Sequence, residues 1–527
     1  MPASGERAAA RREIPAPLRR DVGLLGRLLG QVIAEQGGAD LLEDVEKLRR
    51  LVIAARSSAR DERMAEQLVA SWSVERAEQV ARAFTCYFHL ANLAEEHHRA
   101  RVLRERDSGE RPSSESLAAT IGQLRRRLGS RRLSRLLAEL EVQPVFTAHP
   151  TEARRRAVVT AIRRVGDQLE RLEDPRLSSA ERQDSMRRLL EEIDILWRTG
   201  QLRSTQPQPL DEVRAVTSVF DETLFRAVPE IYRSLDRALD PLSSGRRPPL
   251  APAFLRFGSW VGGDRDGNPS VTARVTAEAM EVQAEHALLA LGNAATRIGR
   301  SLTVETRTTP ASQALRRRLA TARRADPARA AELEKRSPSE LHRQFLLHVA
   351  DRLRATLRGL AGSYRSPAQL LADLRLLQSS LAAAGADRLA YGELQHLVWQ
   401  AETFGLHLAE LEIRQHSSQL TASEEMLETF RTMSRLQERY GVEACRRFVV
   451  SFTRSASDVA KVFELADLAT AGAPPVIDAV PLLETQADLE RAVEVLDEVL
   501  ELAPVRKRLA ETGRRVEVML GYSDSAK

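Results

Sequence analysis

The feature that most constrains the fold is a set of short apolar runs that end in polar, chemically reactive residues. Roughly six such runs, rich in β-branched and aromatic residues, begin near 144, 254, 406, 448, 476 and 516. Runs of this length and composition predict β-strands. The segments between them are long and amphipathic, as helices are. Strands that alternate with helices and carry polar groups at their carboxyl ends predict an α/β barrel.

Most of the remaining sequence predicts helix. The helical ranges are 20–56, 60–106, 115–140, 153–203, 211–240, 272–302, 311–362 and 367–404. We therefore expect a mostly helical protein with a TIM-like α/β barrel whose strands are separated by long helical insertions. A closed barrel of this class has eight strands, so we expect the barrel to be incomplete within these 527 residues.

The composition predicts three regions: a disordered tail over 1–20, an N-terminal helical region over 21–140, and a truncated barrel with helical insertions over 141–527. The two cysteines, Cys86 and Cys445, are far apart in sequence and form no disulfide or metal pattern, which favours a reducing cytoplasm. No uncharged apolar run approaches the length of a membrane span, so we expect no membrane partner.

Arginine supplies nearly all of the basic charge. The net charge is +5 and the isoelectric point about 9.4, yet the chain has only five lysines. Acidic residues are interspersed nearly everywhere, which is typical of arginines on solvated helix faces; some of these arginines can instead face an anionic ligand. Aromatic residues make up only 4%, which argues against a nucleic-acid partner bound by base stacking.

The first run ends in the sequence VFTAHPTEARRR, which closes on His149. The proline after the histidine favours an extended conformation at His149 and ends the strand. Three arginines, Arg154, Arg155 and Arg156, fall on the first turn of the next helix, where the helix dipole already favours an anion. A histidine beside an anion can transfer protons near neutral pH. The alternative is a buried histidine that is hydrogen-bonded to the backbone.

The second run continues into the glycine-rich sequence GSWVGGDRDGNP. Glycines let a backbone approach a ligand closely, and a tryptophan can keep water from a reactive intermediate. The alternative is a tight turn with local salt bridges. The predicted substrate-pocket residues are Trp260, Gly262, Gly263, Asp264, Arg265 and Asp266.

Charged residues also close later runs. Arg414 closes the third run, Glu484 the fifth, and Asp524 and Lys527 the last. Two carboxylates at strand ends are what a Mg²⁺ site typically supplies, and no histidine or cysteine pair has a zinc-site spacing. Lys527 is a lysine in a chain that otherwise uses arginine, which favours a role that needs a point charge or a removable proton.

Together these stretches resemble the phosphoenolpyruvate carboxylase family. VFTAHPTEARRR and VMLGYSDSAK resemble its histidine and lysine signatures, and GSWVGGDRDGNP, LEIRQHS, ASDV, PLLET and FHLANLAEEHHRAR recur in the same order. The resemblance covers essentially all of residues 20–527. Family members continue for several hundred residues more, and that part would hold a glycine- and arginine-rich substrate loop, further arginines and the last strands. We therefore expect these residues alone to be inactive.

The resemblance implies the reaction of phosphoenolpyruvate with bicarbonate to give oxaloacetate and phosphate, with Mg²⁺ or Mn²⁺. In the cell this carbon–carbon lyase would supply four-carbon acid to the tricarboxylic acid cycle, as an allosteric cytoplasmic homotetramer at full length. By the same resemblance His149 is the general base, Arg414 holds the phosphoryl group and Lys527 helps to place bicarbonate. Glu484 and Asp524 are then the metal ligands.

The resemblance also implies a second role for part of the arginine cluster, because Arg155, Arg156 and Arg203 match a sugar-phosphate activator site. Two rival interpretations remain open. One is another barrel enzyme that handles an enolpyruvate, such as a mutase or a kinase, and it differs in not depending on bicarbonate. The other is a non-catalytic helical scaffold or basic binding protein, which predicts that the acids at 484 and 524 lie far apart.

Overall fold

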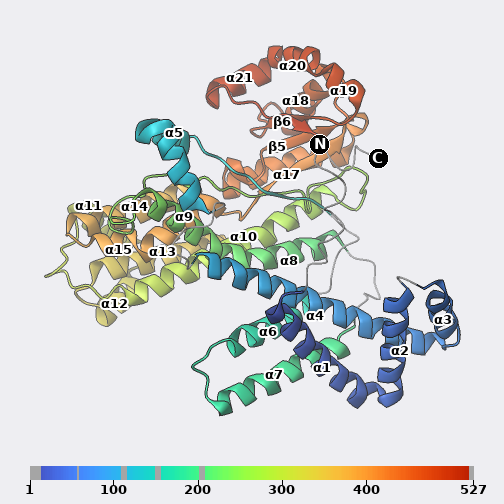
Figure 1. Cartoon of the computed structure of the whole chain (residues 1–527). Helices are drawn as coiled ribbons and strands as arrows, with labels where there is room; N and C mark the ends of the chain where they lie inside the picture. The colour runs from blue at the N-terminus through green and yellow to red at the C-terminus, as the bar shows by residue number, and fades with distance from the viewer. Residues whose placement is uncertain (1–13, 56–57, 108–115, 149–155, 201–207, 522–527) are drawn as a thin grey trace. The chain divides into compact units, whose positions relative to one another are not determined.

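The structure is a computed structural model that describes residues 14–55, 58–107, 116–148, 156–200 and 208–521. The chain forms two compact units, one made of Met1–Ser116 with Arg154–Gln206 and the other of Leu117–Ala153 with Pro207–Lys527. Figure 1 labels their helices and strands. Among the described residues, no helix has both the length and the apolar character needed to cross a membrane.

The first unit is a helical bundle. Its helices are α1 (Ala16–Gly37), α2 (Ala39–Ala55), α3 (Ala59–Ala70), α4 (Val74–Asp107), α6 (Arg156–Leu172) and α7 (Ser179–Arg198). Apolar side chains on one stripe of the helices form a shared core, which includes Leu25, Leu41, Leu90, Val165 and Ile193. The single helix expected over 20–56 is divided at Gly38, whose φ of +85° suits glycine and cannot continue a right-handed helix.

The second unit contains most of the helices and all of the assigned strands. Its helices before the third strand are α5 (Leu117–Ala138), α8 (Pro209–Val219), α9 (Phe225–Leu239), α10 (Ala273–Ser301), α11 (Gln313–Ala325), α12 (Pro327–Arg336), α13 (Leu341–Leu357), α14 (Pro367–Ala383), α15 (Asp387–Tyr391) and α16 (Glu393–Phe404). The later ones are α17 (Glu424–Tyr440), α18 (Ala456–Thr470), α19 (Gln486–Glu490), α20 (Ala492–Glu501) and α21 (Ala503–Glu511). A π-helical turn, η2 (Phe220–Leu224), joins α8 to α9.

The strands of this unit are short and all of their pairings are parallel. They are β1 (Val145–Phe146), β2 (Gly258–Ser259), β3 (Glu410–Leu411), β4 (Ile413–His416), β5 (Arg447–Ser451), β6 (Asp478–Leu483) and β7 (Met519–Leu520). They pair in chain order, as β1-β2-β3 in one sheet and β4-β5-β6-β7 in the other. Every residue of β5 is buried, as expected for a parallel strand that is covered on both faces. Figure 1 shows β5 and β6 among α17, α18 and α19.

The two sheets are consecutive along the chain, because only Glu412 separates β3 from β4. Each of the six predicted runs contains at least one of these strands. The expectation of a mostly helical protein with short parallel strands between helices is therefore confirmed. Its finer form, a TIM-like barrel, stays a prediction.

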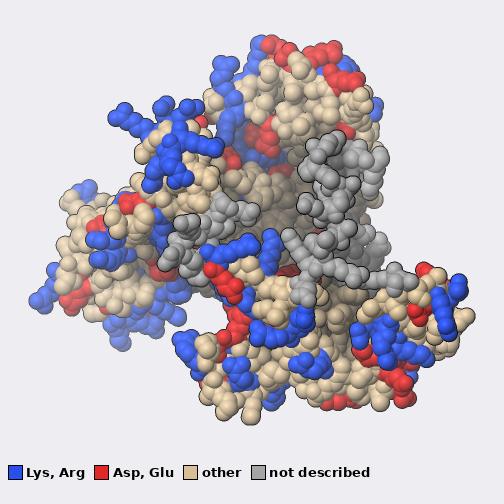
Figure 2. All heavy atoms as spheres, in the orientation of Figure 1, with Lys and Arg blue, Asp and Glu red and all other residues tan. Residues whose placement is uncertain are grey.

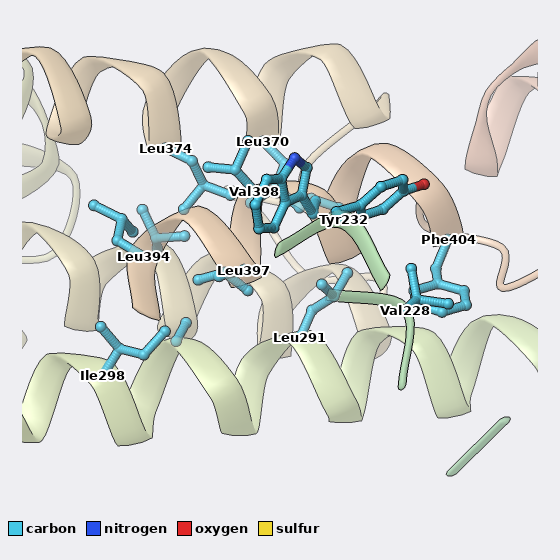
Figure 3. Packing of buried hydrophobic residues seen from close by; sticks show 14 of the residues in the cluster. Val228, Tyr232, Leu291, Ile298, Leu370, Leu374, Leu394, Leu397, Val398 and Phe404 are labelled. Atoms are coloured by element: carbon cyan, nitrogen blue, oxygen red, sulfur yellow. The ribbon is translucent and has the colours of Figure 1, made fainter. Parts of the chain in front are cut away.

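An aromatic core fixes the approach to the second and third strands. Phe257, directly before β2, stacks on Phe404 at the end of α16 with ring centroids 5.7 Å apart. Phe404 also stacks on Phe225 of α9 at 4.4 Å. The Tyr232 hydroxyl accepts a hydrogen bond from the Leu255 backbone N–H at 3.0 Å. Figure 3 shows Tyr232 and Phe404 within this cluster of side chains from α9, α10, α14 and α16. The packing therefore sets where β2 and β3 begin.

Basic side chains gather over α5, as Figure 2 shows. The helix carries Arg125, Arg126, Arg127, Arg131, Arg132 and Arg135, and it has no acidic residue. On other helices many arginines lie beside acids one turn away. Arg187, for example, lies 3.1 Å from Asp184 and 2.9 Å from Glu191. Exposed pairs of this kind add little stability, which agrees with arginines on solvated faces.

Candidate active site

The structure describes part of the predicted site. It describes Trp260, Gly262, Gly263, Asp264, Arg265, Asp266, Arg414 and Glu484. Outside the described residues lie His149, Arg155, Arg203, Asp524 and Lys527. Arg156 begins α6, but its side chain is not described. The roles of this second group therefore stay predictions.

Arg414 pairs with the loop that follows β2. It lies within β4, two residues before His416 ends the strand, so the prediction that Arg414 closes this run is wrong. Its backbone N–H donates to the Gly263 carbonyl at 3.1 Å, and its carbonyl accepts from the Arg265 N–H at 2.9 Å. Its side chain makes a two-pronged contact with Asp264, from Nε to Oδ1 at 2.8 Å and from Nη2 to Oδ2 at 3.0 Å. Such paired contacts fix the guanidinium plane.

This pairing leaves part of the Arg414 guanidinium available. Among the described residues, Nη1 has no hydrogen-bond partner, whereas Nε and Nη2 both contact Asp264. Burial opposes the positive charge, but the hydrogen bonds and charge of Asp264 raise the pKa of Arg414 above its usual value. Arg414 is therefore a fixed cation with a donor that can bind an anion.

Trp260 stacks on the same guanidinium. The Arg414 Cζ atom lies 4.6 Å from the centroid of the indole ring, which is a cation–π contact. The indole Nε1 donates to Glu412 Oε2 at 2.8 Å. Glu412 therefore orients Trp260, and Trp260 in turn covers Arg414. Sequence reasoning missed Glu412; the signal for it was an acid inside the apolar run LHLAELEIRQHS.

Glu412 is a buried acidic residue. Only 1% of its surface is exposed. Burial raises its pKa to about 7, although the hydrogen bond from Trp260 acts in the opposite direction. Near neutral pH this side chain therefore exists in both protonation states, and either state keeps an oxygen that can accept from the indole.

The buried acid predicts a pH-dependent stability. The folded protein holds the Glu412 proton up to about pH 7, whereas the unfolded chain loses it near its ordinary value of 4.5. Between these two values the folded state binds more protons, so its contribution to stability is present at low pH and is lost as the pH rises. The loss is on the order of a few kcal/mol.

We expect Glu412→Gln to reduce this decline, since glutamine still accepts from the indole but does not titrate. The measurement is the urea midpoint of unfolding at pH 5.5 and pH 7.5 for both proteins. A matched exposed change, Glu278→Gln, should leave the pH dependence as it is. The account of Glu412 is wrong if the variant and the original chain lose stability equally.

Two glycines let the loop after β2 pack against the protein itself. Gly262 has a φ of +90°, and a Cβ there would lie 2.5 Å from the Cβ of Ala279 on α10. A Cβ on Gly263 would overlap the Glu412 carbonyl group. The Gly262 carbonyl also accepts from the Thr276 hydroxyl at 2.8 Å. The two glycines thus let the loop pack closely against α10 and against Glu412, the residue between β3 and β4.

The two remaining charges of the loop point in different directions. Asp266 Oδ2 accepts from the Ser451 hydroxyl at 2.8 Å and lies 3.9 Å from Arg414 Nη2. Arg265 instead donates to Glu425 on α17 at 2.8 Å. The loop is therefore held to the end of β5 by Asp266 and to α17 by Arg265, and Asp266 is the one that faces Arg414.

Glu484 joins this group from the end of β6. Its Oε2 accepts from the Phe452 backbone N–H at 3.0 Å, and its other carboxylate oxygen has no hydrogen bond to a described residue. Burial raises its pKa, the Phe452 N–H and the charge of Arg414 lower it, and the charge of Asp266 raises it. Asp266 is hydrogen-bonded to Ser451 and Glu484 to the adjacent Phe452, so both carboxylates lie at the end of β5. The carboxyl ends of β2, β4 and β6 thus converge.

Phe452 is held in a strained conformation beside Glu484. It has a positive φ of +52°, which is uncommon for a residue other than glycine. Its ring stacks on His416 with centroids 4.6 Å apart. This conformation aims the backbone N–H at the Glu484 carboxylate, so the end of β5 positions the acid at the end of β6.

The gathered charges and the parallel strands define a class of protein. In parallel α/β proteins, ligand sites lie in the loops at the carboxyl ends of the strands, and here those loops bring together an arginine, three carboxylates and an indole. Sequence comparison then gives the family. The profile of the phosphoenolpyruvate carboxylase family matches residues 18–423 and 418–527. The chain belongs to this family.

Individual relatives agree. The chain is 35% identical to the phosphoenolpyruvate carboxylase of Roseiflexus castenholzii over 98% of this chain and 62% of that protein. It is 33% identical to the enzyme of that name from an Azoarcus species, over 97% of this chain and 62% of the relative. For the Ralstonia nicotianae protein the identity is 32%, over 97% and 59%. The chain therefore spans about three fifths of the length of the curated relatives that it matches.

Proposed function

We propose that the protein carboxylates phosphoenolpyruvate with bicarbonate, giving oxaloacetate and phosphate. The observation that carries the proposal is the fixed Arg414 cation, which has a free donor, is covered by Trp260 and faces Asp266 and Glu484. The substrate carries a phosphate and a carboxylate, so a site for it needs preorganised cations and shelter from water. The name of the matched relatives gives the same reaction.

The proposed reaction begins at the phosphorus atom. A bicarbonate oxygen attacks it, and the bond from phosphorus to the enol oxygen breaks, which gives carboxyphosphate and the enolate of pyruvate. Arg414 holds the transferred phosphoryl group, and Lys527 helps to place bicarbonate. His149 then takes the proton of carboxyphosphate, which splits into carbon dioxide and phosphate. The enolate carbon attacks carbon dioxide and forms the new carbon–carbon bond of oxaloacetate.

Water is the competitor in the second half of this reaction, because an exposed enolate is protonated to pyruvate. Trp260 is suited to exclude water, since its ring centroid lies 4.6 Å from the Arg414 Cζ atom and its one polar atom is hydrogen-bonded to Glu412. The indole therefore presents an apolar surface that binds no water tightly.

The family implies a divalent cation, Mg²⁺ or Mn²⁺, and we assign it to Glu484 and Asp524. The described part of this donor set fits a hard cation, since Glu484 keeps one carboxylate oxygen free and oxygen ligands are what such ions prefer. No group of three or more histidine, cysteine or acidic side chains that could bind a metal occurs among the described residues. When bound, the cation would stabilise negative charge on the enol oxygen.

We further propose that Arg155, Arg156 and Arg203 bind a sugar phosphate as an allosteric activator, and that the full-length enzyme is a cytoplasmic homotetramer feeding the tricarboxylic acid cycle. The barrel form of the fold, with its 141–527 bounds, belongs to the same proposal. Its support is the seven short strands of the described residues, which pair in parallel and in chain order as β1-β2-β3 and β4-β5-β6-β7.

The test is the reaction catalysed by the native protein purified from its own source. Phosphoenolpyruvate, bicarbonate and Mg²⁺ are supplied, and oxaloacetate is detected through malate dehydrogenase. We expect oxaloacetate and phosphate in equal amounts, both dependent on bicarbonate. A mutase or a kinase would convert phosphoenolpyruvate without bicarbonate. Phosphoenolpyruvate turnover that ignores bicarbonate, or no turnover at all, would overturn the proposal.

A further inference from the structure

A cavity lies among the helices of the second unit. Its volume is about 570 Å³, which is within the range of small-molecule sites. It is formed by α9, the loop that follows α9, the end of α10, Leu381 of α14, α15 and the start of α16, and no residue of an assigned strand lines it. Part of its wall is apolar and comes from Ile298 and Leu394, which Figure 3 shows at one end of the buried cluster.

Three arginines line this cavity: Arg233, Arg237 and Arg388. Neither the Arg237 nor the Arg388 side chain makes a hydrogen bond or an ion pair with any described residue. Both side chains are exposed, so together they give the mouth of the cavity a positive charge that no acid of the described residues pairs with. Such charge attracts an anion.

Arg233 is the buried member of the set, with only 7% of its surface exposed. Its Nη2 donates to the Tyr391 carbonyl at 2.6 Å, while Nη1 lies 3.9 Å from Asp236 Oδ2, beyond hydrogen-bond distance. Burial lowers its pKa, the charge of Asp236 raises it, and the charge of Arg237 lowers it further. A buried cation that is only partly compensated gains most from an anionic ligand.

The loop after α9 contributes a glycine and a serine hydroxyl to the cavity. Gly245 has a φ of +77°, and a Cβ there would lie 3.3 Å from Arg233 Nη1, so glycine lets the loop pass close to the guanidinium. The neighbouring Ser244 lines the cavity, and its hydroxyl is buried without a hydrogen-bond partner in the described structure. A buried hydroxyl of this kind usually has a partner, and a ligand oxygen would supply one.

The start of α16 faces the same space. Gly392, its N-cap residue, has no side chain that can accept from the first turn, and both Gly392 and Leu394 line the cavity. The Gln395 N–H of the first turn already donates to the Gly392 carbonyl at 3.0 Å, so among the described residues the N–H groups of Glu393 and Leu394 are the ones that favour an anion here. This feature acts together with the arginines and the unpartnered serine hydroxyl.

Two acids also line the cavity, and they limit what it can bind. Glu393 forms an ion pair with Arg297 at 2.9 Å, and Arg297 does not line the cavity, so the charge of Glu393 is already neutralised. Glu230 has no ion pair at hydrogen-bond distance, although its charge raises the pKa of Arg233. Three guanidiniums against one uncompensated carboxylate leave a positive cavity, with one acceptor suited to a hydroxyl of the ligand.

We propose that this cavity binds a small metabolite with a phosphate or carboxylate head group, at a site separate from the candidate active site. The head group contacts Arg233, Arg237, Arg388 and the start of α16, and the rest of the molecule lies between Glu230 and the apolar wall. Arginine forks suit both kinds of head group, so the test must distinguish them.

The test is calorimetric titration of the 527-residue chain with inorganic phosphate and, separately, with succinate. We expect saturable binding of at least one of them, and the stronger of the two identifies the head group. Arg388→Gln and Arg237→Gln should each weaken it by about tenfold or more, as expected for loss of a charged hydrogen bond. Both residues lack partners among the described residues, so the fold should survive either change.

Two controls make the result specific. Arg307→Gln, an exposed arginine without a described partner, should leave affinity unchanged and so exclude a general charge effect. Arg414→Gln separates the two sites, because it should abolish phosphate binding at the candidate active site and leave the cavity's binding intact. The proposal is overturned if neither anion binds saturably, if both cavity variants bind as tightly as the original chain, or if Arg414→Gln removes all binding.

Discussion

Arg414→Lys is expected to lower the kcat/KM of the native enzyme for phosphoenolpyruvate by about 10²–10³-fold, the usual cost of losing one preorganised charge contact. Lysine keeps the positive charge, so simple attraction of the anionic substrate should survive. What it loses is the planar fork. The guanidinium contacts Asp264 through Nε and Nη2, makes a cation–π contact with Trp260, and has an Nη1 without a hydrogen-bond partner among the described residues. An ammonium group cannot make all of these contacts from one fixed position.

How that loss divides between kcat and KM shows whether Arg414 acts in the transition state or in substrate binding. If Arg414 holds the phosphoryl group in the transition state, most of the loss appears in kcat. The matched control is Arg274→Lys, an exposed arginine of α10 that pairs with Glu278, and it should leave both constants unchanged. The role of Arg414 is refuted if Arg414→Lys retains most of the original kcat/KM while its circular dichroism and thermal midpoint are normal.

His149→Asn is expected to stop oxaloacetate formation while part of the bicarbonate-dependent phosphate release survives. Asparagine is similar in size but cannot accept the carboxyphosphate proton, and losing a general base typically costs 10²–10⁴-fold. Phosphoryl transfer precedes this proton step in the proposed sequence, so it is impaired less. The two products are measured in parallel on the same sample, oxaloacetate by coupled oxidation of NADH and phosphate by a colorimetric assay.

The control for this change is His286→Asn. His286 is a partly exposed histidine of α10 that pairs with Asp221 of η2. The substitution should leave both products at their original rates. Equal loss of oxaloacetate and phosphate in His149→Asn would mean that the histidine acts before or during phosphoryl transfer, and the general-base role would then be wrong.

Much of the fold could be predicted because it depends on local patterns. A strand that is buried on both faces needs a short apolar run, and the amphipathic period of the intervening segments is that of helices. The prediction was less accurate inside the long helical ranges, where it missed the ends of individual helices. The range 311–362, for example, contains α11, α12 and α13, because Pro327 starts a new helix and α12 is capped at Ser337. Such breaks depend on one or two residues that a periodic pattern tolerates.

Part of the candidate site could also be predicted, since polar groups that follow parallel strands meet at one edge of a sheet. Asp264, Arg414 and Glu484 were selected on that ground, and the structure brings these three together. Whether Asp524 and His149 join them stays a prediction, because both lie outside the described residues. Sequence reasoning missed Glu412, whose partner Trp260 is 152 positions away.

The sequence by itself determined the order and type of the elements, the glycine-rich turn after β2 and the family to which the chain belongs, because each is written in residues that are close along the chain. Only the tertiary structure decided which residues act on one another across long separations. It assigned α5 to one unit and α6 and α7 to the other, aimed the Phe452 N–H at Glu484, and placed Arg237 and Arg388 at a cavity with no ion-pair partner among the described residues. Charge and burial at such places depend on neighbours in space, and a linear pattern does not specify those neighbours.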